Sequence, residues 1–178
     1  MHTYVALLRG VNFGGRTRIR MADLRLALEH AGFTSASTLL QTGNVVLRSA
    51  ASRTTVGDVV EATVQTVFSL DVTVVVRTAE EIHDIVDSGT FNEEQLAEPR
   101  LAHVLFCRET PHPERFREMR AEVVGSEMVK LREDEIFVHY AGRATASRIT
   151  NSFVERRLGT RVTARNWNTV LKIRDRVS

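Results

Sequence analysis

Apolar positions in the first half of the chain alternate between short continuous runs and stripes at helical spacing. Continuous runs of about four to eight residues are typical of strands buried on both faces, whereas apolar residues three or four apart line one face of a helix. The elements predicted in this way are a strand at 3–9, a helix from Met21 to Ala31, a hairpin of strands at 37–41 and 44–49, a helix from Val56 to Val67 and a strand at 72–77. The order β-α-β-β-α-β is that of the ferredoxin-like fold.

The same order of elements begins again beyond residues 88–100, where Gly89 and Pro99 mark the best internal boundary. The elements predicted around it are a helix at 79–87, a strand at 101–108, a helix at 114–123, a hairpin of strands at 128–132 and 136–140, a helix from the N-cap Ser147 to Leu158, a short strand at 161–164 and a terminal helix capped by Asn166 or Asn168. We therefore predict an α+β protein of two ferredoxin-like halves, residues 1–88 and 89–178, packed as one compact unit. The halves share element order without evident residue identity, so the internal duplication is one of plan only.

A glycine-rich loop follows the first predicted strand and carries arginines but no acidic residue. Gly10, Gly14 and Gly15 permit positive φ and close approach by another molecule, and arginines offer paired donors to phosphate or carboxylate. The loop nearly matches the phosphate-binding pattern G-x-x-x-x-G-K-[ST], but Arg16 replaces the lysine and residues 18–20 delay the helix. We therefore expect an anion-binding loop and not a nucleotide-hydrolysing one. The alternative is a loop shaped by its own turns, with arginines paired to acidic residues of the chain.

The ferredoxin-like plan brings a second polar segment to the same sheet edge. Because the third strand lies between the first two and runs antiparallel to both, the hairpin turn at 41–44 lies beside the loop. Amides and guanidinium groups orient a ligand but are neither nucleophiles nor bases at neutral pH, so no catalytic residue can be named. The alternative is that Gly43 and Asn44 only form a turn and Gln41 only satisfies backbone groups. The candidate ligand-binding residues at this edge are Arg9, Gly10, Asn12, Gly14, Gly15, Arg16, Gln41, Gly43 and Asn44.

The segment Arg165-Asn166-Trp167 near the C-terminus has two interpretations. As ligand-binding residues, Arg165 would join an anionic pocket and Trp167 would stack on a base. As structural residues, Asn166 would cap the terminal helix and Trp167 would pack it onto the sheet. His103 and Cys107 lie about 13 Å apart on one predicted strand, too far for proton transfer. No histidine pair has ligand spacing, so we expect no metal site and no cofactor.

Charge is segregated along a chain whose net charge is only +2. The balance is +3 for residues 1–78, −8 for 79–135 and +7 for 143–178. The basic ends would pair with the acidic middle, form a solvated face or contact an anionic partner such as nucleic acid. RNA-binding modules of this plan stack bases on aromatic residues of their first and third strands, but Tyr4 is the single aromatic residue in 3–9 and 44–49. We therefore expect a sheet face covered by the other half or by a second copy.

Compartment follows from composition. No apolar run approaches the roughly 18 residues that a membrane span needs, the run at 4–8 is too short for a signal peptide, and a single cysteine excludes an internal disulfide. These observations predict a cytoplasmic protein without membrane contact.

Three segments in order resemble a bacterial family of about this size that is catalogued only as a domain of unknown function. They are Tyr4-Val5-Ala6-Leu7-Leu8-Arg9-Gly10-Val11-Asn12-Phe13-Gly14-Gly15, Gln41-Thr42-Gly43-Asn44-Val45-Val46 and Arg165-Asn166-Trp167-Asn168-Thr169-Val170. The resemblance implies a single-family protein of two ferredoxin-like halves and implies no activity. Two departures are Phe13, where a smaller aliphatic residue is common, and Ala146-Ser147-Arg148, which replaces a run containing Ser-Lys.

These observations predict a binding module for a small anionic, phosphate-bearing ligand at the Arg9–Gly15 loop. The alternatives are nucleic-acid association through the basic terminal segments, an enzyme of unknown reaction, and a structural or homo-oligomeric role. The lack of a nameable acid, base or nucleophile weighs against the enzyme.

Overall fold

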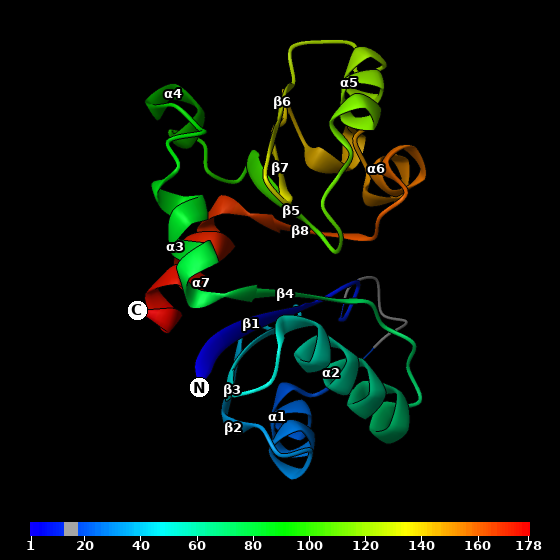
Figure 1. Ribbon diagram of the computed structural model, residues 1–178. Helices are drawn as coiled ribbons and strands as arrows, with labels where there is room; N and C mark the ends of the chain where they lie inside the picture. Colours follow the sequence, from blue (N-terminus) through cyan, green and yellow to red (C-terminus); the bar gives the residue numbers. More distant parts are fainter. Residues whose placement is uncertain (13–17) are drawn as a thin grey trace. The chain divides into compact units, whose positions relative to one another are not determined.

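The computed structural model describes residues 1–12 and 18–178, which form two four-stranded antiparallel sheets with their helices (Figure 1). The chain divides into two compact units, residues 1–87 together with 172–178, and residues 88–171. The sequence placed the whole terminal helix in the second half. In the structure its last residues group with the first unit, where Ser178 Oγ lies 3.5 Å from His83 Nε2.

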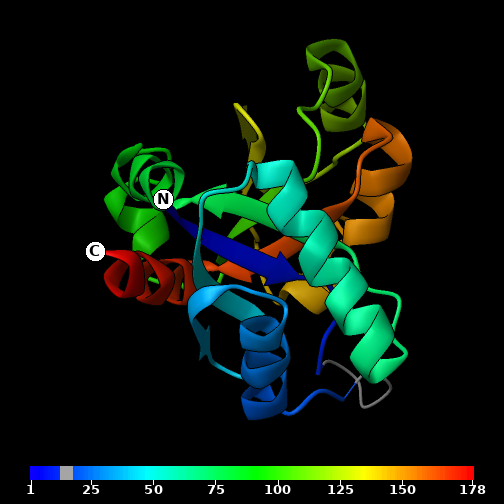
Figure 2. The ribbon, with the colours of Figure 1, turned by 60° about the horizontal axis from the view of Figure 1, so that its bottom comes forward.

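The first unit has the strand order β2-β3-β1-β4, with β3 between β1 and β2 and antiparallel to both. This is the order of the ferredoxin-like fold, so the fold predicted from the hydrophobic pattern is confirmed. Helices α1 (Met21–His30) and α2 (Arg53–Phe68) lie on one face of the sheet (Figure 2). The elements are β1 (His2–Leu8), α1 (Met21–His30), β2 (Thr34–Leu39), β3 (Asn44–Ser49), α2 (Arg53–Phe68), β4 (Val74–Thr78) and α3 (Ala79–Asp87).

The core of the first unit follows from alternation along its strands. In β1, Tyr4, Ala6 and Leu8 face the helices and join a cluster that includes Leu24 of α1 and Val60 of α2. The intervening residues of β1 are also fully buried, which is why this strand appears in the sequence as a continuous apolar run. Burial of each such side chain contributes about 1.5–3 kcal/mol to stability, so the inner strand anchors the sheet edge described below.

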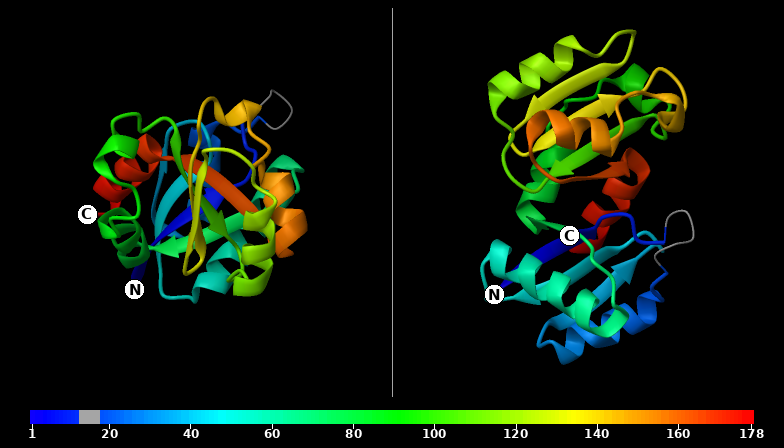
Figure 3. Two further views of the ribbon diagram at one scale, coloured as in Figure 1. Left: turned by 90° about the horizontal axis from the view of Figure 1, so that it is seen from above. Right: turned by 90° about the vertical axis from the view of Figure 1, so that its right-hand side faces the viewer.

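The second unit repeats this topology with the order β6-β7-β5-β8. Its helices α5 and α6 pack together beside the sheet (Figure 3), where Met119 and Val154 join the core with Leu105 and Ile136. The elements are α4 (Glu93–Leu96), β5 (Ala102–Cys107), α5 (Pro113–Ala121), β6 (Met128–Arg132), β7 (Glu135–His139), α6 (Asn151–Leu158), β8 (Val162–Asn166) and α7 (Trp167–Val177), the last of which continues into the first unit.

Two elements of the second unit differ from the prediction. Helix α6 begins at Asn151 with Thr150 as its N-cap, and not after Ser147. Ser147 instead follows a 3₁₀ turn at Ala144–Ala146 and its Oγ accepts a hydrogen bond from Ile149 N, which satisfies a non-helical turn. Helix α4 was missed because four residues are too few to show periodicity, although its N-cap Asn92 forms a capping box.

The two units share hydrogen bonds at corresponding positions of their sheet edges. In each, the end of the first strand donates to the hairpin turn, and the next residue donates to the segment before the fourth strand. These pairs reveal a correspondence between the halves that the sequence alone did not show. The four bonds are Leu8 N to Gly43 O at 2.8 Å, Arg9 N to Thr73 O at 2.9 Å, Cys107 N to Asp134 O at 3.0 Å and Arg108 N to Arg161 O at 2.9 Å.

Two buried arginines, Arg77 and Arg165, extend this correspondence to the fourth strand of each unit. Each is paired across the sheet with a valine of the unit's first strand. Each also donates from Nη1 to the carbonyl oxygen of the preceding residue at 2.8 Å. The same side chain therefore makes the same backbone bond at equivalent positions of both sheets.

Candidate functional site

The edge where β1 ends and the β2–β3 turn begins is the first candidate site, as the sequence predicted from topology. Gly43 has φ +73°, and a Cβ atom there would lie 2.9 Å from Leu8 Cβ and 3.3 Å from Val11 Cβ. Only a glycine permits both this backbone conformation and this approach. The role that the structure assigns to Gly43 is therefore to seat the turn against β1.

Asn12 holds the loop and the turn together through its side-chain amide. Its Nδ2 donates to Ile19 O at 2.9 Å and to Gln41 O at 2.7 Å, and its Oδ1 accepts from Ile19 N at 2.9 Å. Both amide hydrogens are thereby engaged with backbone. Asn12 also has φ +57°, a conformation that asparagine adopts more readily than most residues. The structure thus uses Asn12 to frame the site.

Asn44 has a similar structural use. Its side chain is 0% exposed, and its Nδ2 donates to Leu39 O at 2.9 Å and to Thr42 Oγ1 at 3.2 Å. These bonds close the hairpin from inside, so a ligand at the surface has no access to this amide. Of the polar cluster predicted from the sequence, Gln41 is the exposed member with its side chain at the edge.

A hollow of about 320 Å³ lies beside this frame and is lined by Asn12, Arg18, Ile19, Arg20 and Gln41. Both arginines are exposed; Arg20 Nε lies 3.1 Å from Asp23 Oδ2, whereas Arg18 has no ion pair within the described residues. Among the described residues, no acidic side chain lines the hollow. The charged side chains that line it within this part of the chain are both arginines.

Helix α1 begins at the rim of this hollow. Arg20 is its N-cap residue, and its side chain does not cap the first N–H groups of the helix. A helix N-terminus carries partial positive charge, which favours anions and disfavours neighbouring cations. Two arginines at such a position concentrate positive potential, which a bound anion would relieve.

The remaining candidate residues of the loop are placed as follows. Gly10 is exposed with φ +70°, and Arg9 is half-buried with its backbone N–H bonded to Thr73 O. Gly14, Gly15 and Arg16 lie outside the described residues. Arg18 and Arg20 were not among the candidate residues predicted from the sequence, although both lie in the segment between β1 and α1.

The Arg165-Asn166-Trp167 segment lies in the second unit and takes the structural roles that the sequence offered. Asn166 Oδ1 accepts from Thr169 N at 2.9 Å, so the prediction that it caps the terminal helix is confirmed. Trp167 is buried against Phe91, with ring centroids 5.2 Å apart. Arg165 is buried and donates to Thr163 Oγ1 at 2.8 Å, and burial lowers its pKa to about 10, which leaves it charged at neutral pH.

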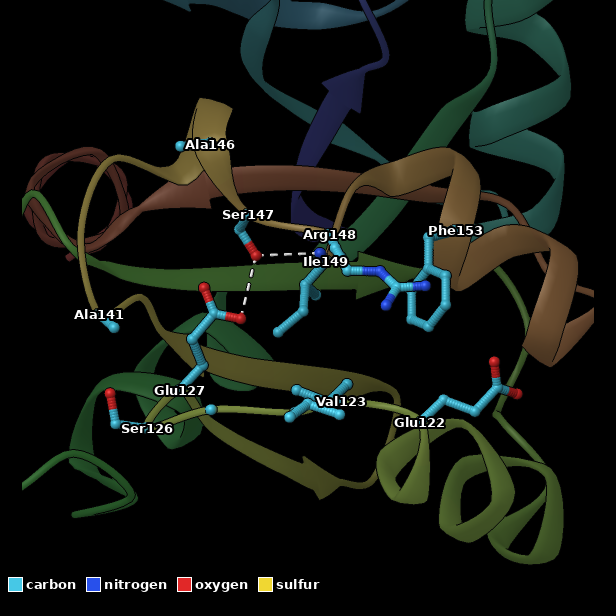
Figure 4. Close-up of a pocket in the computed structure, with 12 residues that line it drawn as sticks. Glu122, Val123, Ser126, Glu127, Ala141, Ala146, Ser147, Arg148, Ile149 and Phe153 are labelled. Atoms are coloured by element: carbon cyan, nitrogen blue, oxygen red, sulfur yellow. Dashed lines mark hydrogen bonds between the residues drawn. The ribbon is translucent and has the colours of Figure 1, made fainter.

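A second hollow, of about 310 Å³, lies in the second unit between the end of α5, the start of β6 and the segment before α6 (Figure 4). Ser147 Oγ donates to Glu127 Oε2 at 3.1 Å and accepts from Ile149 N at 2.9 Å. The sequence offered one signal for it, the Ala146-Ser147-Arg148 departure from the family pattern. It named none of these residues as a site.

Histidines and metal ligands give no third site. Among residues 1–12 and 18–178, no three His, Cys, Asp or Glu side chains gather as a metal site. His103 lies edge-on to Tyr140 with ring centroids 5.0 Å apart, and burial lowers its pKa below the ordinary value of 6.5. Within the same described residues, no helix combines the length and hydrophobicity of a membrane span.

Comparison with known proteins places the chain in a family. Residues 1–137 match the model of the family described as "Protein of unknown function (DUF1697)". The chain belongs to this family. The resemblance of the sequence to a family of unknown function is thereby confirmed. The DUF1697 match ends before the Arg165–Val170 segment. The comparison with curated proteins found no match.

Solved structures similar to this DUF1697 chain include one described as "the structure of conserved bacterial protein SP0830 from Streptococcus pneumoniae". The two are 18% identical and superpose with a TM-score of 0.76 over 99% of each chain. At this identity the likeness establishes the α+β fold and carries no statement about activity.

Proposed function

We propose that the hollow lined by Arg18, Arg20 and Gln41 binds a small anionic ligand through a phosphate group. The observation that carries the proposal is a hollow at the N-terminus of α1 whose described lining includes two arginines and no acidic residue, and whose N-cap Arg20 makes no side-chain cap. Arginine forks match phosphate oxygens in paired, charge-assisted hydrogen bonds, and the helix N–H groups would add donors from the backbone.

The proposal divides the candidate residues into two groups. Asn12, Gly43 and Asn44 form the frame, because their side chains or their backbone are committed to the turn. Arg18, Arg20 and Gln41 would contact the ligand. The Arg20–Asp23 pair is exposed, and such surface pairs contribute only about 0–1 kcal/mol, so a phosphate would compete with Asp23 for the guanidinium at little cost.

The size of the hollow limits the ligand. A volume of about 320 Å³ stands at the lower end of the range for small-molecule sites. A phosphorylated metabolite of a few carbon atoms fits this volume, whereas a dinucleotide does not. The described lining residues include no acid or base, which supports binding without chemistry on the ligand.

Calorimetric titration with inorganic phosphate, pyrophosphate and glycerol phosphate tests the proposal. Arg18→Gln should weaken binding at least about tenfold, the equivalent of about 1.4 kcal/mol. Arg25→Gln is the matched control, because Arg25 pairs with Glu29 on α1 and does not line the hollow. Equal affinity in the Arg18 and Arg25 variants would contradict the proposal.

Titration of the same variants with nucleic acid decides the nucleic-acid alternative. Binding of a short RNA or DNA that falls steeply with salt and survives Arg18→Gln would favour an interface at the basic terminal segments instead. Binding of the small phosphates alone, with the loss expected for Arg18→Gln, would favour the hollow.

A further inference from the structure

We infer that the hollow of the second unit is a separate binding site for a small zwitterion with an apolar body, of which an apolar α-amino acid is the simplest example. The inference rests on one carboxylate and one guanidinium that both line the hollow and have no ion pair within the described residues. The apolar surface beside them supplies the third element of recognition.

The carboxylate is that of Glu127. It is half-buried and accepts the Ser147 hydroxyl at 3.1 Å on Oε2, and within the described residues it has no ion pair and Oε1 has no hydrogen bond. A cation beside a half-buried carboxylate favours its charged form. An ammonium group at Oε1 would supply that charge.

The guanidinium is that of Arg148, which has no ion pair among the described residues and is exposed. Figure 4 shows Glu127 directed toward Ser147 and Arg148 extending toward the side where Phe153 lies. The other acidic lining residue, Glu122, is already paired with Arg157 at 2.6 Å. One negative and one positive group therefore remain available to a ligand.

The apolar surface comes from Val123, Ile149 and Phe153. Ile149 belongs to the core of the unit, and the other two pack against that core. Val124 at the rim is 85% exposed, an unusual exposure for a branched apolar side chain. The hollow thus offers an apolar surface beside its two charges, which suits a ligand with an aliphatic or aromatic body.

The segment that carries the site is held in place before any ligand arrives. Tyr140 OH donates to Ile149 O at 3.1 Å, Ile149 N donates to Ser147 Oγ, and Thr150 N donates to Arg148 O at 2.9 Å. Ser147 is accordingly a positioning residue that orients the Glu127 carboxylate. Preorganisation of this kind lowers the entropic cost of binding.

Titration of the full chain with phenylalanine and with 6-aminohexanoic acid, followed by NMR, tests the inference. The two probes carry the same charged groups at short and long separation, so one of them should bind saturably and shift the amides of the hollow. N-acetylation of the probe that binds should weaken it about tenfold, as expected for loss of a charge-assisted hydrogen bond. Amidation of its carboxylate should have a similar effect.

Variants that remove one charge at a time separate recognition from a merely structural role. Glu127→Gln keeps an acceptor for Ser147, and in this variant acetylation should change the affinity less than about twofold. Arg148→Gln should abolish the effect of amidation in the same way, whereas Arg143→Gln, in the same loop but outside the hollow, should behave as the wild type. The inference is overturned if neither probe binds at about 10 mM, a concentration above the dissociation constant expected of so small a ligand. An equal effect of acetylation in wild type and Glu127→Gln also overturns it.

Discussion

Asn12 and Gln41, 29 positions apart in the sequence, are joined by a hydrogen bond of 2.7 Å from the Asn12 amide to the Gln41 carbonyl oxygen. The same amide pairs with both backbone groups of Ile19. One side chain therefore ties the residues after β1, the residues before α1 and the β2–β3 turn into one frame. This frame explains why Arg18, Arg20 and Gln41 line a single hollow.

Replacing Asn12 should destabilise the first unit. Asn12→Ala removes three hydrogen bonds to backbone groups and places alanine at φ +57°, so we expect the free energy of unfolding to fall by about 2–3 kcal/mol. Urea denaturation measures the change. Gln41→Ala is the control, because only the backbone of Gln41 accepts this bond, and it should alter stability by less than about 0.5 kcal/mol. Similar losses in both variants would show that the Asn12 amide does not hold the frame.

Two glycines of the site separate conformational strain from steric contact. Gly10 and Gly43 have φ of +70° and +73°, but a Cβ on Gly10 meets nothing within 4 Å, whereas one on Gly43 lies 2.9 Å from Leu8 Cβ. Gly10→Ala should cost about 1 kcal/mol from the backbone alone, and Gly43→Ala about 2–4 kcal/mol because overpacking is added. Thermal or urea unfolding of the two variants gives the comparison, and equal costs would disprove close packing of the turn on β1.

His103 should make stability depend on pH. Burial lowers its pKa below 6.5 in the folded chain, so above that value both states are neutral and the folded state suffers no penalty. As pH falls through 6.5 the unfolded chain binds a proton that the folded chain resists, and stability is lost. His103→Phe keeps a ring against Tyr140 and should lose less stability than the wild type between about pH 8 and 5. If the free energies of unfolding of the two proteins change with pH in parallel, His103 is not the origin of the pH dependence.

The phenol of Tyr140 should ionise at a higher pH than an ordinary tyrosine. Burial, with a contribution from the negative charge of Glu127, raises the pKa of its phenol from 10.0 to about 12. Stability from the neutral phenol is therefore present below pH 10 and is lost as pH rises from 10 toward 12. The difference in ultraviolet absorbance between wild type and Tyr140→Phe during alkaline titration isolates this group. A step in the difference near pH 10 would show that the phenol is not shielded.

The sequence predicted the fold well because strands with buried faces and short glycine-containing turns leave local signals. The ferredoxin-like order and the meeting of the Arg9 loop with the 41–44 turn followed from element order alone. Features that depend on tertiary hydrogen bonds could not be predicted, because local sequence patterns do not show them. Ser147 looked like an N-cap, but its hydroxyl bonds Glu127 and Ile149 N in a non-helical turn.

The meeting of the loop and the turn at one sheet edge followed from the predicted topology, but the roles of the residues there could not be predicted. Asn12 and Asn44 are polar residues in a loop and a turn, and only the structure shows that their amides are committed to backbone and neighbouring side chains. Arg18 and Arg20 belong to the arginine-bearing loop but were not among its candidate residues, because nothing in the sequence tells which arginine lines a hollow. The second hollow depends on residues from three separate segments, which no linear pattern joins.

Residue-resolved NMR during titration with inorganic phosphate tests the central claim most directly. We predict saturable shifts of the Met21, Ala22 and Asp23 amides at the start of α1 and of the Arg18 side-chain Nε–H, abolished by Arg18→Gln and retained in Arg25→Gln. Shifts of similar size at all exposed arginines, or none at the start of α1, would contradict anion binding at this hollow.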